Sequence, residues 1–214
     1  MEELLDAINN NFEGVEKIQQ MLLNEAPKYG NDDDYADSIA QSLFDVYFKV
    51  IDGRPNTKGG KYRINLLPTT VHIYFGRVTG ATPNGRRDGE PLSEGISPSQ
   101  GADKNGPTAV FKSIGKLDHA KTGGTLLNQK FMPKLLEDET GVNKLAHLIR
   151  AYFKLGARHL HFNVVDVKTL RDAQKHPEKY RDLIVRVAGY SDYFVDVGKE
   201  LQDEIISRTE QSYF

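Results

Sequence analysis

Near the C-terminus, one glycine separates a β-rich run from a helical pattern, and this junction constrains the fold more than any other stretch. Gly189 follows the run 183–187 and precedes the aromatic residues Tyr190 and Phe194. Glycine enters left-handed backbone conformations at little steric cost, so a sharp turn is expected here. For an isolated glycine, the ordinary interpretation is a turn between a buried strand and a helix.

The residues around Gly189 are more specific than a turn requires. Residues 186–194 read Arg-Val-Ala-Gly-Tyr-Ser-Asp-Tyr-Phe, which resembles the RVxGYxxxF signature of glycyl radical enzymes. That family includes pyruvate formate-lyase, the glycerol and diol dehydratases and the arylacetate decarboxylases, and residues 201–209 resemble its tail helix. The resemblance implies that Gly189 stores the radical in a loop of about residues 183–194. Support for this loop would come from Arg186, Val187, Ala188, Tyr190, Ser191 and Phe194.

The chemistry of a stored backbone radical requires glycine. Removing hydrogen from a Cα leaves an unpaired electron shared between the flanking amide nitrogen and the carbonyl. Sharing requires a flat Cα, and a side chain resists flattening because it contacts its neighbours. Glycine has no side chain, so its radical is the easiest backbone radical to form and keep.

Two further segments carry the same resemblance. Residues 24–37 resemble a run upstream of the C-terminal third of glycyl radical enzymes. Residues 79–109 resemble a family loop that packs beside the glycyl loop, with Asp88 where alanine is common. The amino-acid sequences of residues 189–194 and 90–101 resemble those of the eliminase and decarboxylase branch of the family. Enzymes of this branch remove water, amine, sulfite or carbon dioxide from small molecules.

The chain contains no cysteine, so it forms neither disulfides nor thiolate metal sites. In the resembled enzymes the glycyl radical abstracts hydrogen from a cysteine, whose thiyl radical acts on the substrate. We therefore expect that the chain is not catalytic alone. The partner would be a cysteine-bearing first half of the barrel, on the same full-length chain or on a partner subunit.

Composition excludes several function classes. A net charge of −2 gives no basic field for nucleic acid or anionic lipid. No apolar run approaches a membrane span, and no charged-then-apolar leader opens the chain. These features predict a cytoplasmic protein with no nucleic-acid or membrane partner, and we expect an oligomer.

Hydrophobic patterning predicts an α/β protein. We expect helices at 1–23, after the acidic cap 31–34, at 142–155 and at 168–174. We expect strands at 62–75, 126–131, 159–165 and 183–187, and a loop-rich segment at 76–124. The resembled fold is a ten-stranded barrel, of which this chain would supply the second half with the C-terminal glycyl radical loop. Residues 1–60 would pack outside the barrel, and residues 61–214 would form the half-barrel.

Other sites have weaker support. His72, Tyr74 and Phe162 lie on predicted strands that would face the substrate cavity, although ordinary core positions explain them equally well. Alternation places His159, His161 and Asn163 on one side of a strand, a spacing that can hold a metal. No carboxylate or cysteine joins the histidines, so we predict no metal. The acidic run 32–34 lacks the spacing of a calcium loop.

The resemblance implies a radical lyase component that cleaves a C–O, C–N, C–S or C–C bond. It needs no bound cofactor, because a radical S-adenosylmethionine iron–sulfur activase installs the radical. The loop must leave the core for activation, and oxygen would destroy the radical. We expect Arg186 to pair with a carboxylate or carbonyl, and Tyr190 and Phe194 to pack the loop into the barrel.

Two alternatives remain open. One is a stand-alone "spare part" that replaces the oxygen-cleaved end of a damaged enzyme, although such proteins are usually shorter. The other is a non-catalytic relic or interaction module that keeps the fold without the radical.

Overall fold

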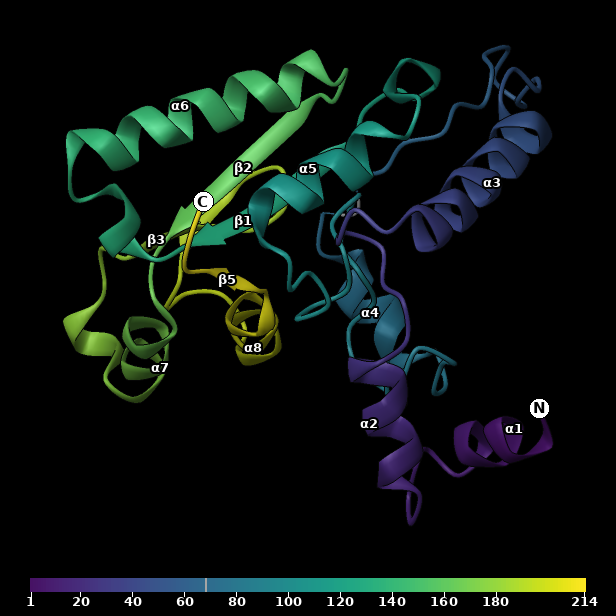
Figure 1. Cartoon of the computed structure of the whole chain (residues 1–214), viewed down its shortest axis with the longest axis horizontal. Helices are drawn as coiled ribbons and strands as arrows, with labels where there is room; N and C mark the ends of the chain where they lie inside the picture. Colours follow the sequence, from purple (N-terminus) through teal and green to yellow (C-terminus); the bar gives the residue numbers. More distant parts are fainter. Residues whose placement is uncertain (68) are drawn as a thin grey trace.

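The computed structural model of the chain describes residues 1–67 and 69–214. The helices are α1 (Glu2–Asn9), α2 (Glu16–Asn24), α3 (Asp34–Ile51), α4 (Val71–Arg77), α5 (Gly106–Gly115), α6 (Glu139–Lys154), α7 (Val167–Lys175) and α8 (Lys199–Ser207). The strands are β1 (Leu126–Phe131), β2 (His159–Val164), β3 (Ile184–Arg186), β4 (Ser191–Tyr193) and β5 (Glu210–Gln211). Short 3₁₀ helices lie at His119–Lys121, Pro133–Leu136 and Pro177–Lys179. Figure 1 shows their arrangement.

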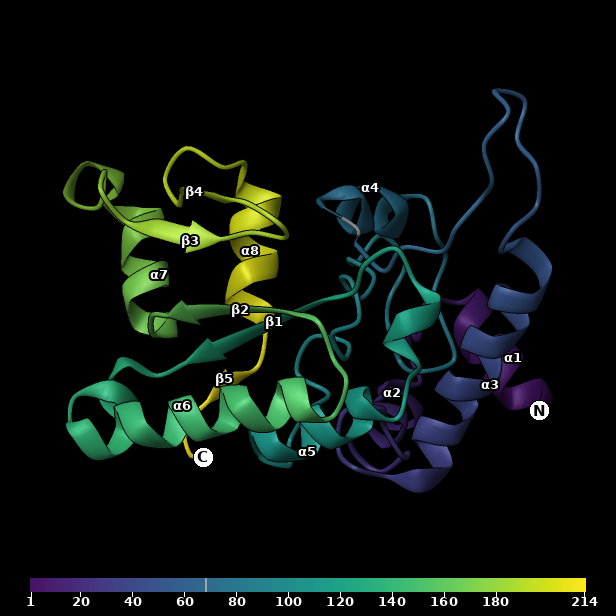
Figure 2. The same cartoon turned by 90° about the horizontal axis from the view of Figure 1, so that it is seen from above.

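The centre of the fold is a parallel sheet in which β1 lies between β2 and β5. β1 and β2 pair along their whole length, with Leu126 opposite His159, and β5 adds a short pairing with Lys130 opposite Glu210. Figure 2 shows α5 and α6 on one side of this sheet, with α7, α8 and the β3–β4 hairpin on the other. Parallel strands with helices on both faces are typical of α/β proteins. The predicted α/β class is confirmed.

Two apolar cores lie on opposite faces of the sheet. The first joins β1, α5 and α6, where the rings of Phe111 and Tyr152 lie 4.6 Å apart and Leu127 is fully buried. The second joins the hairpin to α7 and α8, with buried members Val165, Leu170, Ala173, Val185, Val187, Phe194, Ile205 and Ile206. The hairpin therefore shares its hydrophobic core with α7 and α8.

Alternation along β1 delivers polar side chains to the second face of the sheet. Leu127 belongs to the first core, whereas Asn128 and Lys130 donate to backbone carbonyls of the hairpin and of α8. Lys130 Nζ lies 2.8 Å from Ile206 O, where the last turn of a helix has carbonyls without intrahelical partners. Burial lowers the pKa of Lys130 to about 8.

The N-terminal region corrects one expectation and confirms another. The single helix predicted over 1–23 is wrong, because the chain breaks between α1 and α2. Asn11, Phe12 and Gly14 all have positive φ there, a conformation that no α-helix continues. The acidic cap before α3 is confirmed, since the Asp33 side chain accepts the Ala36 N–H at 3.0 Å.

The strand predicted over 62–75 is also wrong, apart from residue 68, which lies outside the described residues. Leu66 makes one isolated parallel bridge to Thr125, and the β-rich end of the segment forms α4. His72, Ile73 and Gly76 are its buried residues, a spacing that fits one helical face. A Cβ on Gly76 would lie 2.3 Å from Glu90 O, so glycine allows α4 to pack directly on that backbone. Tertiary packing therefore overrides local β propensity.

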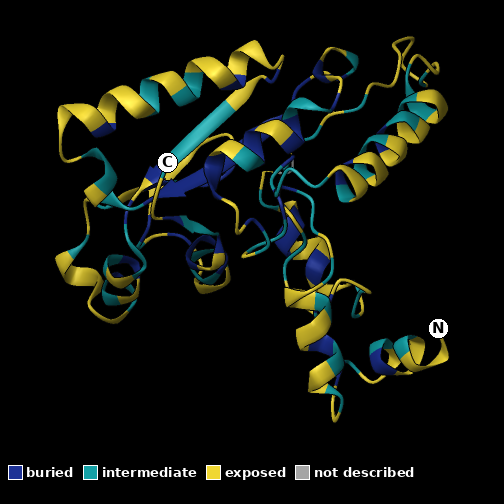
Figure 3. Cartoon of the chain, in the orientation of Figure 1, coloured by how far each residue is buried: buried dark blue, intermediate teal, exposed yellow. Residues whose placement is uncertain are grey.

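The strands and helices predicted between residue 126 and the C-terminus are confirmed within a few residues at their ends. The segment 76–124 is loop-rich as predicted, but it contains α5, which was not expected. Figure 3 shows that α3 is largely exposed. Among the described residues, no helix combines the length and apolar character needed to cross a membrane.

Candidate functional site

Gly189 lies in the turn of the β3–β4 hairpin, at an exposed position. Arg186 pairs with Ser191, and the Val187 N–H donates to Tyr190 O at 2.9 Å, so Ala188 and Gly189 form the turn. The φ of Gly189 is +91°, a region that favours glycine. Beyond its two chain neighbours, no heavy atom of the described residues lies within 4 Å of the position that a Cβ would occupy there. The predicted turn is confirmed, and its Cα is open to an approaching group.

Buried side chains from three elements hold the base of the hairpin. Asn163 of β2 accepts the Arg186 N–H at 2.7 Å and donates to the Arg186 carbonyl at 2.8 Å. Asn128 of β1 donates to the Val187 carbonyl at 3.2 Å. Arg208, directly after α8, donates through Nη1 to the same Val187 oxygen at 2.9 Å. Each contact is to the backbone, so each fixes the course of the chain immediately before Gly189.

Arg208 belongs to a buried polar network. Its guanidinium binds the Glu204 carboxylate through Nε at 3.1 Å and Nη2 at 2.8 Å. Gln100 Nε2 donates to Glu204 Oε1 at 3.1 Å, and His72 Nε2 lies 3.6 Å from the same oxygen. The network thereby links the hairpin to α8, to α4 and to the loop before α5.

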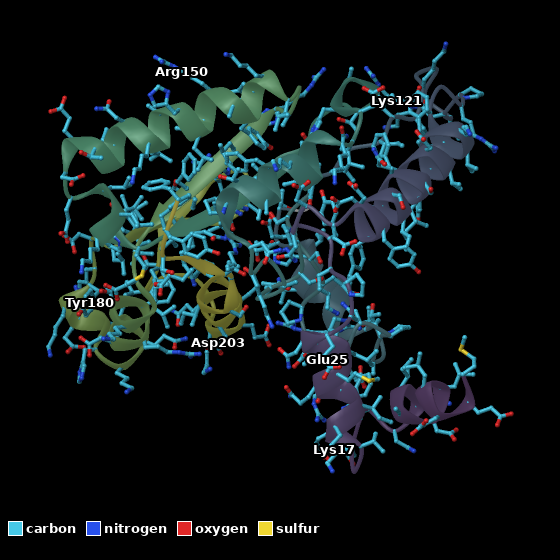
Figure 4. The ribbon with its side chains drawn as sticks, in the orientation of Figure 1. Lys17, Glu25, Lys121, Arg150, Tyr180 and Asp203 are labelled. Carbon is cyan, nitrogen blue, oxygen red and sulfur yellow. The ribbon has the colours of Figure 1, made fainter. Side chains whose placement is uncertain are left out.

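The carboxylate of Glu204 is kept ionised by its neighbours. Burial alone would raise its pKa, but His72 and Arg208 outweigh that effect and hold the pKa at about 2. A buried carboxylate beside a guanidinium is expected to behave in this way. The adjacent Asp203, labelled in Figure 4, stays at the surface, where Arg171 Nη1 lies 3.3 Å from its Oδ1.

The pKa of a second buried carboxylate, Glu94, is shifted in the opposite direction. Burial raises its pKa to about 7, although Arg208 and a hydrogen bond from Ser97 oppose the rise. The Ser97 hydroxyl donates to Glu94 Oε1 and accepts the Asn128 backbone N–H at 3.1 Å. Glu94 therefore contacts the hairpin anchors indirectly, through Ser97 and Asn128.

The predicted supporting residues of the loop divide into buried and exposed groups. Val187, Ala188 and Phe194 are buried, and Phe194 packs in the second core. Tyr190 is 40% exposed and lines an open hollow of about 560 Å³ together with Tyr74 of α4. In the described chain, Tyr190 therefore does not pack the loop inward as predicted.

Arg186 has partners other than those expected. Its Nη1 donates to Ser191 Oγ at 3.0 Å, and its Nη2 lies 2.9 Å from His161 Nε2. Burial and the neighbouring Arg186 charge lower the pKa of His161 to about 4, so the ring is neutral and accepts from the guanidinium. Within residues 1–67 and 69–214, these partners take the place of the expected carboxylate or carbonyl.

The three predicted cavity residues lie in different places. His72 and Tyr74 are on helix α4, not on a strand, and His72 is buried against Glu204 while Tyr74 is exposed. Phe162 alternates with His161 along β2, and its ring packs edge-on against that of Phe131, with 5.4 Å between the ring centroids. It therefore lies on the sheet face opposite the hairpin. Of the three, the structure brings only His72 into the network below Gly189.

The β2 side chains that were considered as a metal site bind other groups of the protein. His161 and Asn163 do share the hairpin face of β2, as alternation predicts, but their side chains bind Arg186. Within residues 1–67 and 69–214, no group of three or more histidine, cysteine or acidic side chains is placed to hold a metal ion.

Sequence reasoning missed the residues that anchor the hairpin: Asn128, Asn163, Glu204 and Arg208. Only one of these contacts had a recognisable signal. Glu204 and Arg208 stand at i and i+4 with the acid first, which is the favourable order for a helical ion pair. The asparagines have no such pattern, because their partners are distant backbone groups.

Comparison with known proteins gives a consistent result. A family model described as "Glycine radical" matches residues 92–195, and one described as "Pyruvate formate lyase-like" matches residues 1–76. The chain is 56% identical to trans-4-hydroxy-L-proline dehydratase of Clostridioides difficile, over all of this chain and 27% of that protein. It is 48% identical to isethionate sulfite-lyase of Nitratidesulfovibrio vulgaris, over 98% of this chain and 26% of that protein.

A solved structure agrees in three dimensions. The crystal structure of hydroxyproline dehydratase from Clostridioides difficile with trans-4-hydroxy-L-proline bound superposes with a TM-score of 0.96, covering 99% of this chain and 27% of that one. The chain thus spans about a quarter of the length of the relatives it matches. The predicted similarity to the dehydratase and lyase branch is confirmed.

Proposed function

The chain belongs to the glycyl radical enzyme family, in the part that carries the radical region, and from this premise we propose that Gly189 stores the radical of a radical lyase. The reaction would be elimination from a small molecule, with the rest of the catalytic unit supplying the cysteine. The observation that carries the proposal is the position of Gly189. It lies in an open turn with positive φ, and buried side chains bind the backbone immediately before it.

In the proposed mechanism, each radical transfer moves one hydrogen atom, that is, one proton together with one electron. An activating enzyme of the radical S-adenosylmethionine class takes one hydrogen atom from the Gly189 Cα, which leaves one unpaired electron there. Gly189 then takes one hydrogen atom from a cysteine thiol on the missing portion, which restores glycine and leaves a thiyl radical. The thiyl radical abstracts one hydrogen atom from the substrate and becomes a thiol. After elimination, the product radical takes a hydrogen atom back from that thiol, which regenerates the thiyl radical.

Exposed apolar faces support the proposal that more protein covers this chain. On α3, Ile39, Leu43, Val46 and Val50 are each about half exposed and follow one helical face. Tyr74 and Tyr190 are exposed beside the hairpin. Contiguous exposed apolar surface typically marks an interaction site. The length of the relatives, about four times this chain, supports a cysteine-bearing portion as the partner.

The spare-part alternative has less support. The match of residues 1–76 to a pyruvate formate lyase-like model lies outside the glycine radical match at 92–195. A replacement for an oxygen-cleaved end needs only the radical region. The additional N-terminal region therefore favours a component of the catalytic barrel.

The test is anaerobic activation of the chain, together with its cysteine-bearing portion and a cognate activase, followed by electron paramagnetic resonance. We expect a doublet that is absent in Gly189→Ala and present in Gly156→Ala. Gly156 is the matched control, because it also has positive φ, at +85°, and an added Cβ there meets no atom within 4 Å beyond its chain neighbours. Air should then cleave the activated chain at residue 189.

Substrate assignment follows in the same assembly. The higher identity to the hydroxyproline dehydratase than to the sulfite-lyase makes dehydration the first reaction to assay, with trans-4-hydroxy-L-proline as the first substrate. Absence of any doublet in the wild-type assembly would overturn radical storage. A doublet without turnover of this substrate would leave radical storage supported and redirect the search to other elimination substrates.

A further inference from the structure

Arg208 makes contacts that span the base of the hairpin. Its Nη1 lies 2.9 Å from the Val187 carbonyl oxygen and 3.3 Å from the Arg186 carbonyl oxygen. These are the two carbonyl groups that precede the peptide joining Ala188 to Gly189. A single planar guanidinium, which presents several donors in a fixed geometry, thus fixes two successive peptide units just before Gly189.

The guanidinium is itself oriented by Glu204. Three hydrogen bonds join the two groups, and the side chains are 8% and 0% exposed. Gln100 donates to Glu204 at 3.1 Å, and His72 approaches it from α4 at 3.6 Å. A buried ion pair is retained at a cost in desolvation and is weak evidence for stability. Its conformational effect is therefore the better explanation.

We propose that Arg208, oriented by Glu204, is a positioning residue that sets the conformation of the Ala188–Gly189 turn for radical storage. This rests on the proposed function of Gly189. Arg208 does not contact the two amide groups that share the unpaired electron, because its acceptors lie one and two peptides earlier in the chain. It acts through the backbone, by fixing the direction in which the turn leaves β3.

The arrangement also links the turn to the rest of the chain. Asn128 shares the Val187 carbonyl with Arg208, and Asn163 shares the Arg186 carbonyl. Among the described residues, Arg208 is the one that joins both carbonyls to the end of α8 and, through Glu204, to α4 and Gln100. Loss of Arg208 should therefore loosen the turn, while the two asparagines keep β3 attached to the sheet.

The test compares Arg208→Lys with Arg171→Lys in the full chain assembled with its cysteine-bearing portion. Lysine keeps the charge but loses the planar fork. Arg171 is the control, because it is an exposed arginine of α7 paired with Asp203 on α8, the helix that carries Glu204. The first readout is amide hydrogen exchange of residues 184–194. We expect Arg208→Lys to accelerate it by at least about tenfold, equivalent to losing one hydrogen bond to a charged group, with Arg171→Lys unchanged.

The second readout is the yield, lifetime and hyperfine splitting of the Gly189 doublet. We expect a several-fold lower yield and an altered splitting in Arg208→Lys. If that variant fails to fold, the double variant Glu204→Met/Arg208→Met removes both buried charges, a change that cores often tolerate, and it should show the same loss of exchange protection.

The outcomes separate the two proposals. A wild-type assembly without a doublet contradicts radical storage, while hydrogen exchange still tests the positioning by Arg208. Wild-type exchange rates at residues 184–194 in Arg208→Lys or in the double variant would overturn the positioning role. An unchanged doublet in the variants would overturn it as well.

Discussion

The Asn163 side chain binds both backbone groups of Arg186, accepting the N–H at 2.7 Å and donating to the carbonyl at 2.8 Å. One carboxamide therefore takes the place that a neighbouring strand would occupy beside β3. It connects the two-stranded hairpin to the edge of the parallel sheet, which the hairpin does not otherwise join by a backbone ladder. The position of Gly189 depends on this link because the turn follows Arg186 by two residues.

Replacing Asn163 by alanine should lower the free energy of unfolding by about 2–4 kcal/mol, because it removes two hydrogen bonds and leaves buried backbone groups unpaired. Urea denaturation measures the change. Val164→Ala, at the neighbouring exposed position of β2, should cost far less. Equal effects of the two substitutions would show that the Asn163 link carries no particular stability.

Gly189→Ala should cost only about 1–2 kcal/mol of stability, the typical penalty of a left-handed conformation for a residue with a Cβ. The φ of +91° causes the strain, and no neighbouring atom adds a clash. Gly95→Ala is the contrast, because its Cβ would lie 2.4 Å from Leu126 O, also at positive φ. We expect that variant to unfold or to lose several times more stability, as measured by thermal denaturation. Comparable losses would contradict the open geometry of the Gly189 turn.

Glu94 should make stability fall as pH rises toward neutrality. Burial raises its folded pKa to about 7 from 4.5. Between these values the unfolded chain releases the proton and the folded chain keeps it, so the folded state loses up to about 3 kcal/mol by pH 7. Asp103, whose pKa burial raises to about 6, contributes in the same direction at lower pH. His161, whose pKa is lowered from 6.5 to about 4, acts in the opposite direction up to about pH 6.5, so the contribution of Glu94 is measured by comparison with a Glu94 variant.

Glu94→Gln should remove the fall in unfolding free energy that Glu94 contributes between pH 6 and 7, relative to the wild-type chain. Glu204 does not interfere, because its folded pKa of about 2 gives stability that is lost only as pH falls from about 4.5 toward 2. Urea unfolding at half-unit pH steps provides the measurement. The same pH profile in Glu94→Gln and in the wild-type chain would assign the fall to another group.

Several elements could be predicted from sequence because their signal is local. β1 follows a turn of small residues at 122–125, β2 alternates polar and apolar side chains, and α6 has a regular apolar stripe, so local patterns locate them. Periodicity did not predict α4, because this seven-residue helix carries the apolar residues Val71, Tyr74 and Phe75 on its exposed side. Its buried positions make sense only once the packing of Gly76 against Glu90 is known.

The residues of the candidate site also divide into those with a local sequence signal and those without one. Gly189 and its motif are local, and a resemblance to one family located them. The anchors Asn128 and Asn163 are separated from the hairpin by 59 and 23 positions in sequence. Hydrogen bonds from side chain to backbone over such distances depend on the register of the sheet. Alternation along a strand predicts which face a side chain lies on, but it does not predict which carbonyl group that side chain will bind.

Lys116→Met should be much more destabilising than Lys112→Met. Lys116 Nζ lies 2.7 Å from Asp37 Oδ2, and the Asp37 side chain is fully buried, so the substitution leaves a buried carboxylate without its cation. That situation typically costs about 3–5 kcal/mol. Lys112 pairs with Asp32 at the surface, where a pair contributes about 1 kcal/mol or less. Similar losses in urea denaturation would mean that Asp37 is stabilised by other groups.

The apolar face of α3, formed by Ile39, Leu43, Val46 and Val50, should bind the cysteine-bearing portion. Burying a leucine and a valine side chain is worth about 1.5–3 kcal/mol each, so Leu43→Ser/Val46→Ser should weaken association by about tenfold or more. Val142→Ser is the matched control, because Val142 is a similarly exposed apolar residue on α6. Sedimentation equilibrium of the mixed portions measures the dissociation constant. If the control weakens association as much as the α3 variant, or if the α3 variant instead abolishes self-association of this chain, the face serves a different contact.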